Sequence, residues 1–253
     1  MNPFDYDLHT HTQFSDGRSS VADMVHAACA NGLKGFVLTD HVFSPEQADQ
    51  LLAQYAQIDR KEYPLPVLFG CETAVQDVNG HPCAHPDQLR KFELVLMDCN
   101  GILFSELARE QLSRENLRDR LCEIMIRACE NAEVDILAHP FNFGNPPLEI
   151  PLELFDNIRV GKIAEAFRKH NKIFEIMNQM YFWHSKIPFE HFHREYMRIL
   201  TVFKNAGVHF SIGSDTHSCC GIGCFRWCER VVGELGIGQE LFIPETFQER
   251  ILK

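Results

Sequence analysis

Short apolar runs alternate with longer amphipathic segments along nearly the whole of this 253-residue chain, and this alternation constrains the fold more than any other feature. The apolar runs have the length and composition of strands that are buried on both faces. Strands that alternate with helices indicate a parallel sheet covered by helices. We find seven candidate strands, at residues 4–9, 34–41, 66–75, 92–100, 134–140, 172–178 and 208–215.

The segments between these strands carry helix signals. Residues 20–32 start at a capping Ser20, repeat apolar residues at helical spacing and end at Gly32. Other helices are expected at about 45–60, 113–132, up to 169, 191–206 and 226–236, with a Pro-rich loop at 144–151. No linker or internal repeat interrupts the pattern, so we expect one domain over residues 1–253. Seven strands favour a barrel over an open sheet.

Polar residues of metal-binding type follow five of the seven candidate strands. They are His9 and His11, Asp40 and His41, Glu72, His139, and Asp215 and His217. In a parallel barrel the carboxyl ends of all strands open onto one face, so these side chains can converge although they span more than 200 positions. Each residue alone is commonly an ordinary strand-end or loop residue. The ordered set predicts a shared site.

Histidine and carboxylate ligands together suit Zn, Mn or Fe, and carboxylates also bridge pairs of metal ions. Such a centre lowers the pKa of a bound water and stabilises charge on phosphoryl oxygens. The residue types are therefore compatible with metal-assisted hydrolysis, of which phosphoester cleavage is one form.

Four motifs in chain order resemble the polymerase and histidinol phosphatase (PHP) family. They are "DLHTH" from residue 7, "TDH" from 39, "AHP" from 138 and "GSDTH" from 213, and the resemblance extends to about residue 224. It implies a distorted seven-stranded (β/α) barrel of the TIM-like type. It also implies two or three divalent ions, of Zn, Mn or Fe, at one centre.

The resemblance also implies the ligands. These are, for one ion, His9, His11 and Asp215; for a second, His139 and Asn100, with Glu72 bridging the two; and for a third, Asp16, His41 and His217. Catalytic roles are implied for Asp16, His41, Glu72 and Asp215.

Asn100 departs from the family pattern, because the fourth strand of such enzymes typically ends in a His that binds the second ion. An amide oxygen is a weaker and harder ligand than imidazole. The second ion is therefore expected to be the loosest, and its coordination is left open to Asp98, Cys99 or water.

The net charge and the composition limit the kinds of partner that this chain is expected to bind. The formal net charge of −11 argues against binding to long nucleic acid and leaves a small phosphorylated substrate as the expected partner. Neither a secretion signal nor a run of about 18 apolar residues is seen, so we expect no membrane segment. The ten cysteines are then expected to be reduced thiols of a cytoplasmic protein. The oligomeric state is left open.

The leading hypothesis is hydrolysis of a small phosphomonoester or nucleotide. One alternative is a hydrolase of the amidohydrolase type, which also begins with H-x-H on a barrel strand, although no matching metal-bridging lysine is seen. The other is a non-catalytic metal-binding PHP module, with Asn100 as a mark of decay.

Three further sets of residues are weaker candidates. Tyr181, Phe182 and Trp183 are expected either to wall a pocket for a ring-bearing substrate or to pack under their loop. Candidate phosphate-binding cations are Arg18, Arg159, Lys186 and Arg226. The group Cys219, Cys220, Cys224 and Cys228 lacks the paired C-x2-C spacing of structural metal sites.

Overall fold

Nine parallel strands form two sheets in the computed structural model, which describes residues 1–104, 106–110, 112–144 and 149–247. Residues 145–148 of the predicted Pro-rich loop and residues 248–253 of the predicted domain lie outside the described residues. In the three-stranded sheet the order is β1 (Tyr6–Asp7), β2 (Gly35–Leu38) and β4 (Val67–Phe69). In the six-stranded sheet the order is β3 (His41–Val42), β5 (Cys71–Ala74), β6 (Val95–Asp98), β7 (Ile136–Ala138), β8 (Ile173–Met177) and β9 (His209–Gly213).

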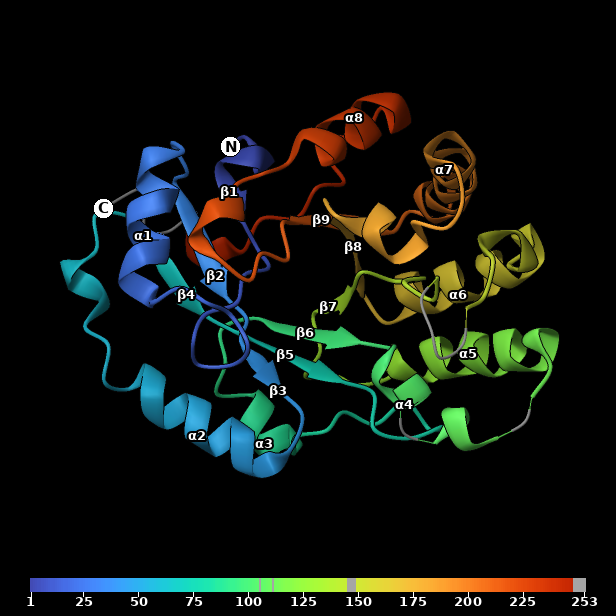
Figure 1. The fold of residues 1–253 in the computed structure, drawn as a ribbon, viewed down its shortest axis with the longest axis horizontal. Helices are drawn as coiled ribbons and strands as arrows, with labels where there is room; N and C mark the ends of the chain where they lie inside the picture. The colour runs from blue at the N-terminus through green and yellow to red at the C-terminus, as the bar shows by residue number, and fades with distance from the viewer. Residues whose placement is uncertain (105, 111, 145–148, 248–253) are drawn as a thin grey trace.

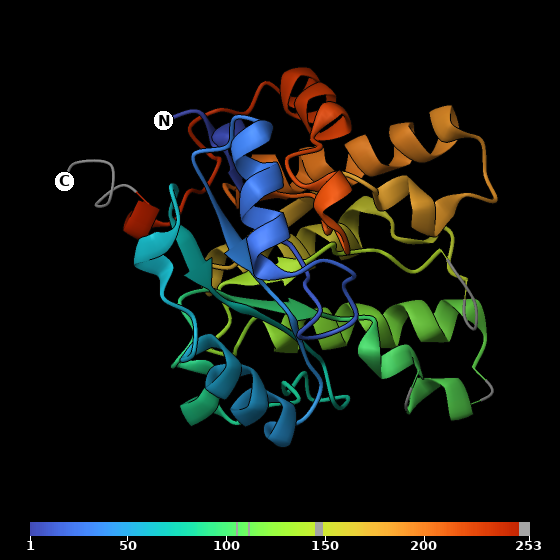
Figure 2. The same cartoon turned by 60° about the vertical axis from the view of Figure 1, so that its left-hand side comes forward.

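Helices surround these strands, as two views of the chain show (Figure 1; Figure 2). The six longest are α1 (Val21–Ala30), α2 (Pro45–Tyr55), α5 (Arg114–Ala128), α6 (Asn157–Lys169), α7 (Phe189–Asn205) and α8 (Arg226–Leu235). Two single-turn helices, α3 (Pro86–Leu89) and α4 (Gly101–Phe104), were not expected. The predicted cap of α1 is confirmed, because the Ser20 side chain accepts a hydrogen bond from the backbone N–H of Asp23 and the Asp23 carboxylate accepts one from the backbone N–H of Ser20. Among the described residues, no helix combines the length and apolar character needed to span a membrane.

The α/β class with parallel strands is confirmed, but the count of seven strands is not. Strands β4 and β5 both lie within the predicted strand 66–75, and the chain changes partners between them. Gly70 N donates to Leu38 O, whereas the next residue, Cys71, donates to Leu94 O. A Cβ on Gly70 would lie only 2.5 Å from Leu94 O, so only glycine fits this crossing point. Strands β2 and β3 are likewise two strands in different sheets, although a single strand was predicted over residues 34–41.

Neither sheet closes on itself through the described strands, so the predicted closed barrel is not reproduced at the level of strand pairing. The two sheets nevertheless meet through the segment that follows β1. Leu8 N donates to Ile212 O, His11 N donates to Thr216 O, and Asp215 N donates to His9 O. This contact joins the first and last motifs of the chain.

The side chains on the inner face of the strands change from apolar to charged along the length of the strands. One apolar cluster consists mostly of strand side chains, among them Leu96 on β6 and Ile173 on β8. Residues two apart on a strand face the same side, so Asp98 and Glu175 extend this inner face toward the carboxyl ends of their strands. The inner face is therefore apolar at one end and charged at the other, and the charged end carries the candidate site.

Candidate metal centre

Eight of the nine predicted ligands lie in three adjoining groups, in each of which one ligand atom per residue lies within 4.8 Å of all the others. The groups are His9, His11 and Asp215; His9, Glu72 and His139; and His11, Asp16, His41 and His217. They share His9 and His11, so they form one continuous centre. The structure thus brings eight of the predicted residues together, and their role as ligands remains a prediction.

Glu72 lies in the middle of the centre and is almost fully buried. Its Oε2 atom is 3.2 Å from His9 Nε2 and 3.5 Å from His11 Nε2. The same oxygen is 3.1 Å from His41 Nδ1, and the other oxygen, Oε1, is 3.1 Å from His139 Nε2. One carboxylate thus touches four imidazoles, which is the geometry expected of a bridging ligand.

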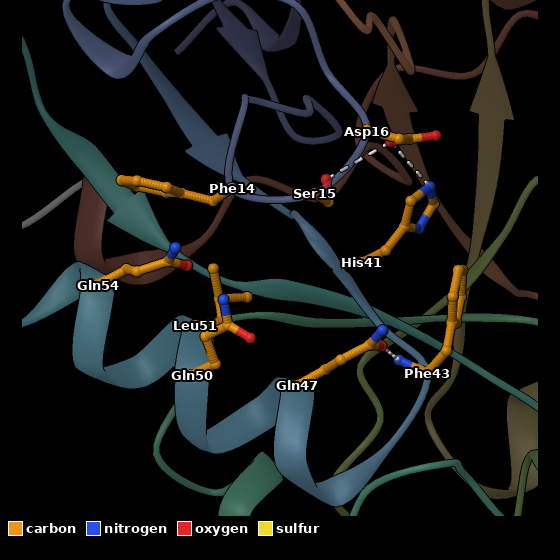
Figure 3. Close-up of a pocket in the computed structure, with 9 residues that line it drawn as sticks. All are labelled: Phe14, Ser15, Asp16, His41, Phe43, Gln47, Gln50, Leu51 and Gln54. Atoms are coloured by element: carbon orange, nitrogen blue, oxygen red, sulfur yellow. Dashed lines mark hydrogen bonds and ion pairs between the residues drawn. The ribbon is translucent and has the colours of Figure 1, made fainter.

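Asp16 approaches the centre from the loop that follows the first motif. Its Oδ1 atom is 3.4 Å from His41 Nε2, a contact drawn in Figure 3. The same oxygen is 3.2 Å from His217 Nε2. The loop turns back at Gly17, whose backbone N–H donates to Thr12 O. A Cβ at Gly17 would lie 2.7 Å from the backbone of His11, so the turn requires glycine.

Two of the predicted ligand residues have unusual backbone conformations. His139 has φ of 30° and Asp215 has φ of 52°, in the region that non-glycine residues seldom adopt. Such strain costs on the order of 1–3 kcal/mol per residue and clusters at functional sites. Here it aims both side chains into the centre.

Nearby charges shift the pKa values at the centre. Burial lowers the pKa of His9, but the carboxylates of Glu175, Asp215 and Glu72 together raise it well above its usual value. Burial likewise opposes a charged His139, yet Glu72, Asp98 and Asp215 raise its pKa to about 10. Burial raises the pKa of Glu72, whereas His9 and His41 bring it well below the usual value. The buried carboxylates therefore stabilise positive charge beside them.

This arrangement fits divalent metal ions. His9 Nε2 and His11 Nε2 face each other at 3.0 Å, a contact that two neutral imidazole nitrogens can satisfy only by sharing a proton or a cation. The buried Nδ1 atom of His11 has no hydrogen-bond partner in the described part of the chain. Imidazole nitrogens and carboxylate oxygens are the donor set that Zn, Mn and Fe accept.

Asn100 is buried beside the second group, and its role as a ligand remains a prediction. Its amide nitrogen donates to Asn142 O at 3.2 Å, and its Oδ1 atom is buried without a hydrogen-bond partner among the described residues. Asn142 in turn contacts His139 Nδ1 through its own amide nitrogen at 2.9 Å. Burial raises the pKa of the neighbouring Cys99 thiol well above its usual value, which disfavours the thiolate that a metal would need.

Glu175 on β8 was missed by the sequence analysis. Its Oε1 atom is 2.7 Å from His9 Nδ1, and its Oε2 atom accepts a hydrogen bond from His139 N at 2.7 Å. A single buried carboxylate thus orients one ligand ring and the backbone of another. The signal was present, because an acid inside the apolar run "KIFEIMN" is out of place in a buried strand.

Asp7 supports the first motif in a similar way. Its side chain accepts hydrogen bonds from the backbone N–H groups of Ser214 and Gly223 and from that of His9. Burial raises the pKa of Asp7 to about 6 against these hydrogen bonds. The acid of the "DLHTH" motif therefore holds the backbone of the first motif and the backbone of the last motif together through hydrogen bonds.

The candidate phosphate-binding cations differ in whether they lie near the centre. Arg18 lines a cavity of about 390 Å³ together with Asp215 and His217, whereas Arg159 pairs with Asp119 and Asp156. Lys186 pairs with Glu149.

Two of the three aromatic residues after β8, Tyr181 and Trp183, pack on the core as one of the two expectations had it, and the pocket wall remains a prediction. The Trp183 ring lies 6.3 Å from that of His139, and Phe182 is 67% exposed. Tyr181 donates a hydrogen bond to Ile187 O and packs on the core. Among the described residues, none of the candidate metal groups contains a cysteine.

Known proteins share this sequence pattern and this fold. The family model described as "PHP domain" matches residues 7–217. A protein named "Probable phosphatase" from Acetivibrio thermocellus is 27% identical over 254 residues, which cover 98% of this chain and 95% of that protein. Another relative with that name, from Enterobacter sp. (strain 638), is 26% identical over 252 residues, covering 95% of this chain and 89% of its own.

A solved structure has a similar fold. Histidinol phosphate phosphatase from Lactococcus lactis subsp. lactis, in complex with zinc, L-histidinol and phosphate, aligns with a TM-score of 0.62. The alignment covers 92% of this chain and 94% of that one at 16% sequence identity, so it supports the fold alone.

Proposed function

We propose that this chain, which belongs to the PHP domain family, is a metal-dependent phosphoesterase that hydrolyses a small phosphomonoester. The observation that carries the proposal is the gathering of eight ligand-type residues from separate motifs into three adjoining groups. Relatives named as phosphatases that cover nearly the whole chain support it.

The proposed architecture is one domain over residues 1–253 in which the two sheets act as a single distorted barrel of the TIM-like type. The hydrogen bonds between residues 8–11 and 212–216 support this, because they link the edge of one sheet to the edge of the other. The breaks at Gly70 and Asp40 would then be the points of distortion.

The proposed ligands follow the three groups. His9, His11 and Asp215 would hold one ion, His139 a second with Glu72 between them, and the remaining three residues, Asp16, His41 and His217, a third. When bound, divalent ions supply positive charge to phosphoryl oxygens and lower the pKa of a water molecule. Two or three ions of Zn, Mn or Fe are compatible with these donors.

The chain's own side chains then prepare the site. Glu72 contacts the imidazoles of His9 and His139 at 3.2 and 3.1 Å. Glu175 orients the His9 imidazole at 2.7 Å and accepts from the backbone N–H of His139. Arg18 lines the cavity that opens at Asp215 and His217, where it can neutralise a phosphate oxygen. The site therefore combines fixed ligands with a cation at its rim.

A phosphoester panel tests this proposal. The metal-free full-length protein is loaded separately with Zn, Mn and Fe, and phosphate release from several small phosphomonoesters is measured beside cleavage of amide substrates. We expect phosphate release that His11→Ala abolishes and that His26→Ala, a change at an exposed helical histidine, leaves intact. Cleavage of amides alone, or no hydrolysis with any of the metals, would contradict the proposal.

A further inference from the structure

A cavity of about 310 Å³ opens directly beside the third group of ligands. Asp16 and His41 lie at one end of it, and helix α2 forms a long side (Figure 3). This volume is at the lower end of the range typical of small-molecule sites, about 300–1,000 Å³. The cavity can therefore hold a group attached to a phosphate at the centre.

Three glutamines of α2 point toward this cavity. Gln47, Gln50 and Gln54 are spaced by three and four residues, which puts them on one face of the helix (Figure 3). Gln54 Oε1 is buried and has no hydrogen-bond partner in the described residues, so a small rotation of this side chain toward a ligand N–H group would satisfy an acceptor that is otherwise unpaired. Gln47 Oε1 accepts from Phe43 N at 2.7 Å, which leaves its amide N–H groups to donate.

The remaining walls are largely aromatic. Phe14 lies at the Gln54 end, and Phe43, which is 48% exposed, stacks on His41 with ring centroids 4.6 Å apart. An exposed phenylalanine beside a candidate active site offers a flat apolar face to a ligand.

Of the described residues that line this cavity, Asp16 and His41 alone have ionisable side chains. A charged group placed among the glutamines would lose water without gaining an ion pair. The cavity therefore favours a neutral and flat group that has both donors and acceptors.

We propose that the cavity walled by Gln47, Gln50 and Gln54 is the subsite for an uncharged heteroaromatic ring of the nucleobase type. The preferred substrate class is then a nucleoside monophosphate, and this part of the inference rests on the proposed phosphoesterase function. Carboxamide groups match such rings because they donate and accept hydrogen bonds side by side, as the ring edges do.

Binding of nucleosides tests the subsite without any chemistry at the centre. Adenosine and uridine are titrated by calorimetry into the wild-type protein and into Gln54→Leu, Gln54→Glu and Gln57→Leu. Gln57 is a matched control, because it is exposed just beyond the same helix and is not part of the cavity lining. Thermal denaturation of each variant verifies folding.

We expect Gln54→Leu to weaken nucleoside binding by about threefold to tenfold, the effect of losing one hydrogen bond. Gln54→Glu keeps an acceptor oxygen and should bind nucleosides more tightly than Gln54→Leu does. Gln57→Leu should bind as the wild type does. No binding of either nucleoside by the wild type, or equal binding by all folded variants, would overturn the subsite.

Substrate selectivity provides a second test of the subsite. The ratio of kcat/KM for adenosine monophosphate to kcat/KM for glycerol 2-phosphate should fall by about threefold to tenfold in Gln54→Leu. A wild-type preference for glycerol 2-phosphate, or for histidinol phosphate with its ammonium-bearing leaving group, would overturn the inference and leave the phosphoesterase function standing. If no phosphomonoester is hydrolysed, the proposed function fails, while the nucleoside titration still judges the subsite.

Discussion

Replacing Glu175 by Gln should weaken metal binding although Glu175 lies in none of the three ligand groups. The side chain is 1% exposed, and its two oxygens lie 2.7 Å from His9 Nδ1 and 2.7 Å from His139 N. Both partners present an N–H group when His9 offers Nε2 to a metal. Glutamine has the same shape but only one oxygen, so its amide NH₂ must face one of these two donors.

The size of the effect follows from these contacts. A hydrogen bond to a charged group contributes about 1.5–3 kcal/mol, and the group left unpaired by its loss is fully buried. Loss of a carboxylate that orients a ligating histidine typically costs about 10- to 100-fold in metal affinity or activity. We therefore expect metal affinity to fall by at least about tenfold in Glu175→Gln.

Competition with a chromophoric chelator measures Zn affinity in the wild type, in Glu175→Gln and in the control Glu165→Gln. Glu165 is exposed on α6, so its replacement should leave affinity unchanged. Urea unfolding of the metal-free proteins separates a loss of fold from a loss of affinity. An affinity for Glu175→Gln within twofold of the wild type, with all proteins folded, would refute the positioning role.

Three other changes test neighbouring parts of the account. In Gly213→Ala the new Cβ would lie 2.1 Å from Glu175 Oε1. We therefore expect lower metal content and a loss of about 1–3 kcal/mol in unfolding free energy. The control Gly233→Ala, whose Cβ would meet open space, should show neither defect. Asn100→His should raise the metal stoichiometry, and Asn100→Ala should lose less metal than His139→Ala does. An empty centre in Asn100→Ala would instead mean that Asn100 is a strong ligand or a structural support. In the metal-free protein the pKa of His139 is raised from 6.5 to about 10, so its stabilising contribution is complete below pH 6.5 and is lost as the pH rises toward 10. Urea unfolding across this range should show that loss, and an equal slope in His139→Gln would contradict it.

The order of strands and helices could be predicted because each element carries its own periodicity. The six long helices lie where apolar residues repeat at helical spacing, and every predicted strand contains one or two observed ones. The break at Gly70 could not be predicted, because it depends on which strand lies beside each half of the run. Hydrogen bonds to Leu38 and Leu94 decide that, and both residues are distant in sequence.

The site was predictable to the extent that its residues belong to motifs. His9, His11, His139 and Asp215 stand in motifs that are specific when taken together in chain order, although no single motif is. Glu175 stands alone in an apolar strand, so its contact with His9 emerges only when β8 lies near the first motif. The glutamines of α2 likewise gain a role only from the loop that folds against them.

Metal reconstitution of one protein sample tests the central claim most directly. The full-length chain is stripped of metal, dialysed against Zn or Mn, and measured for bound metal and for phosphate release from a small phosphomonoester. We expect two or three ions per chain, with phosphate release that appears on loading and disappears on stripping. Loading to that stoichiometry without any phosphate release, or release that persists in the stripped protein, would contradict it.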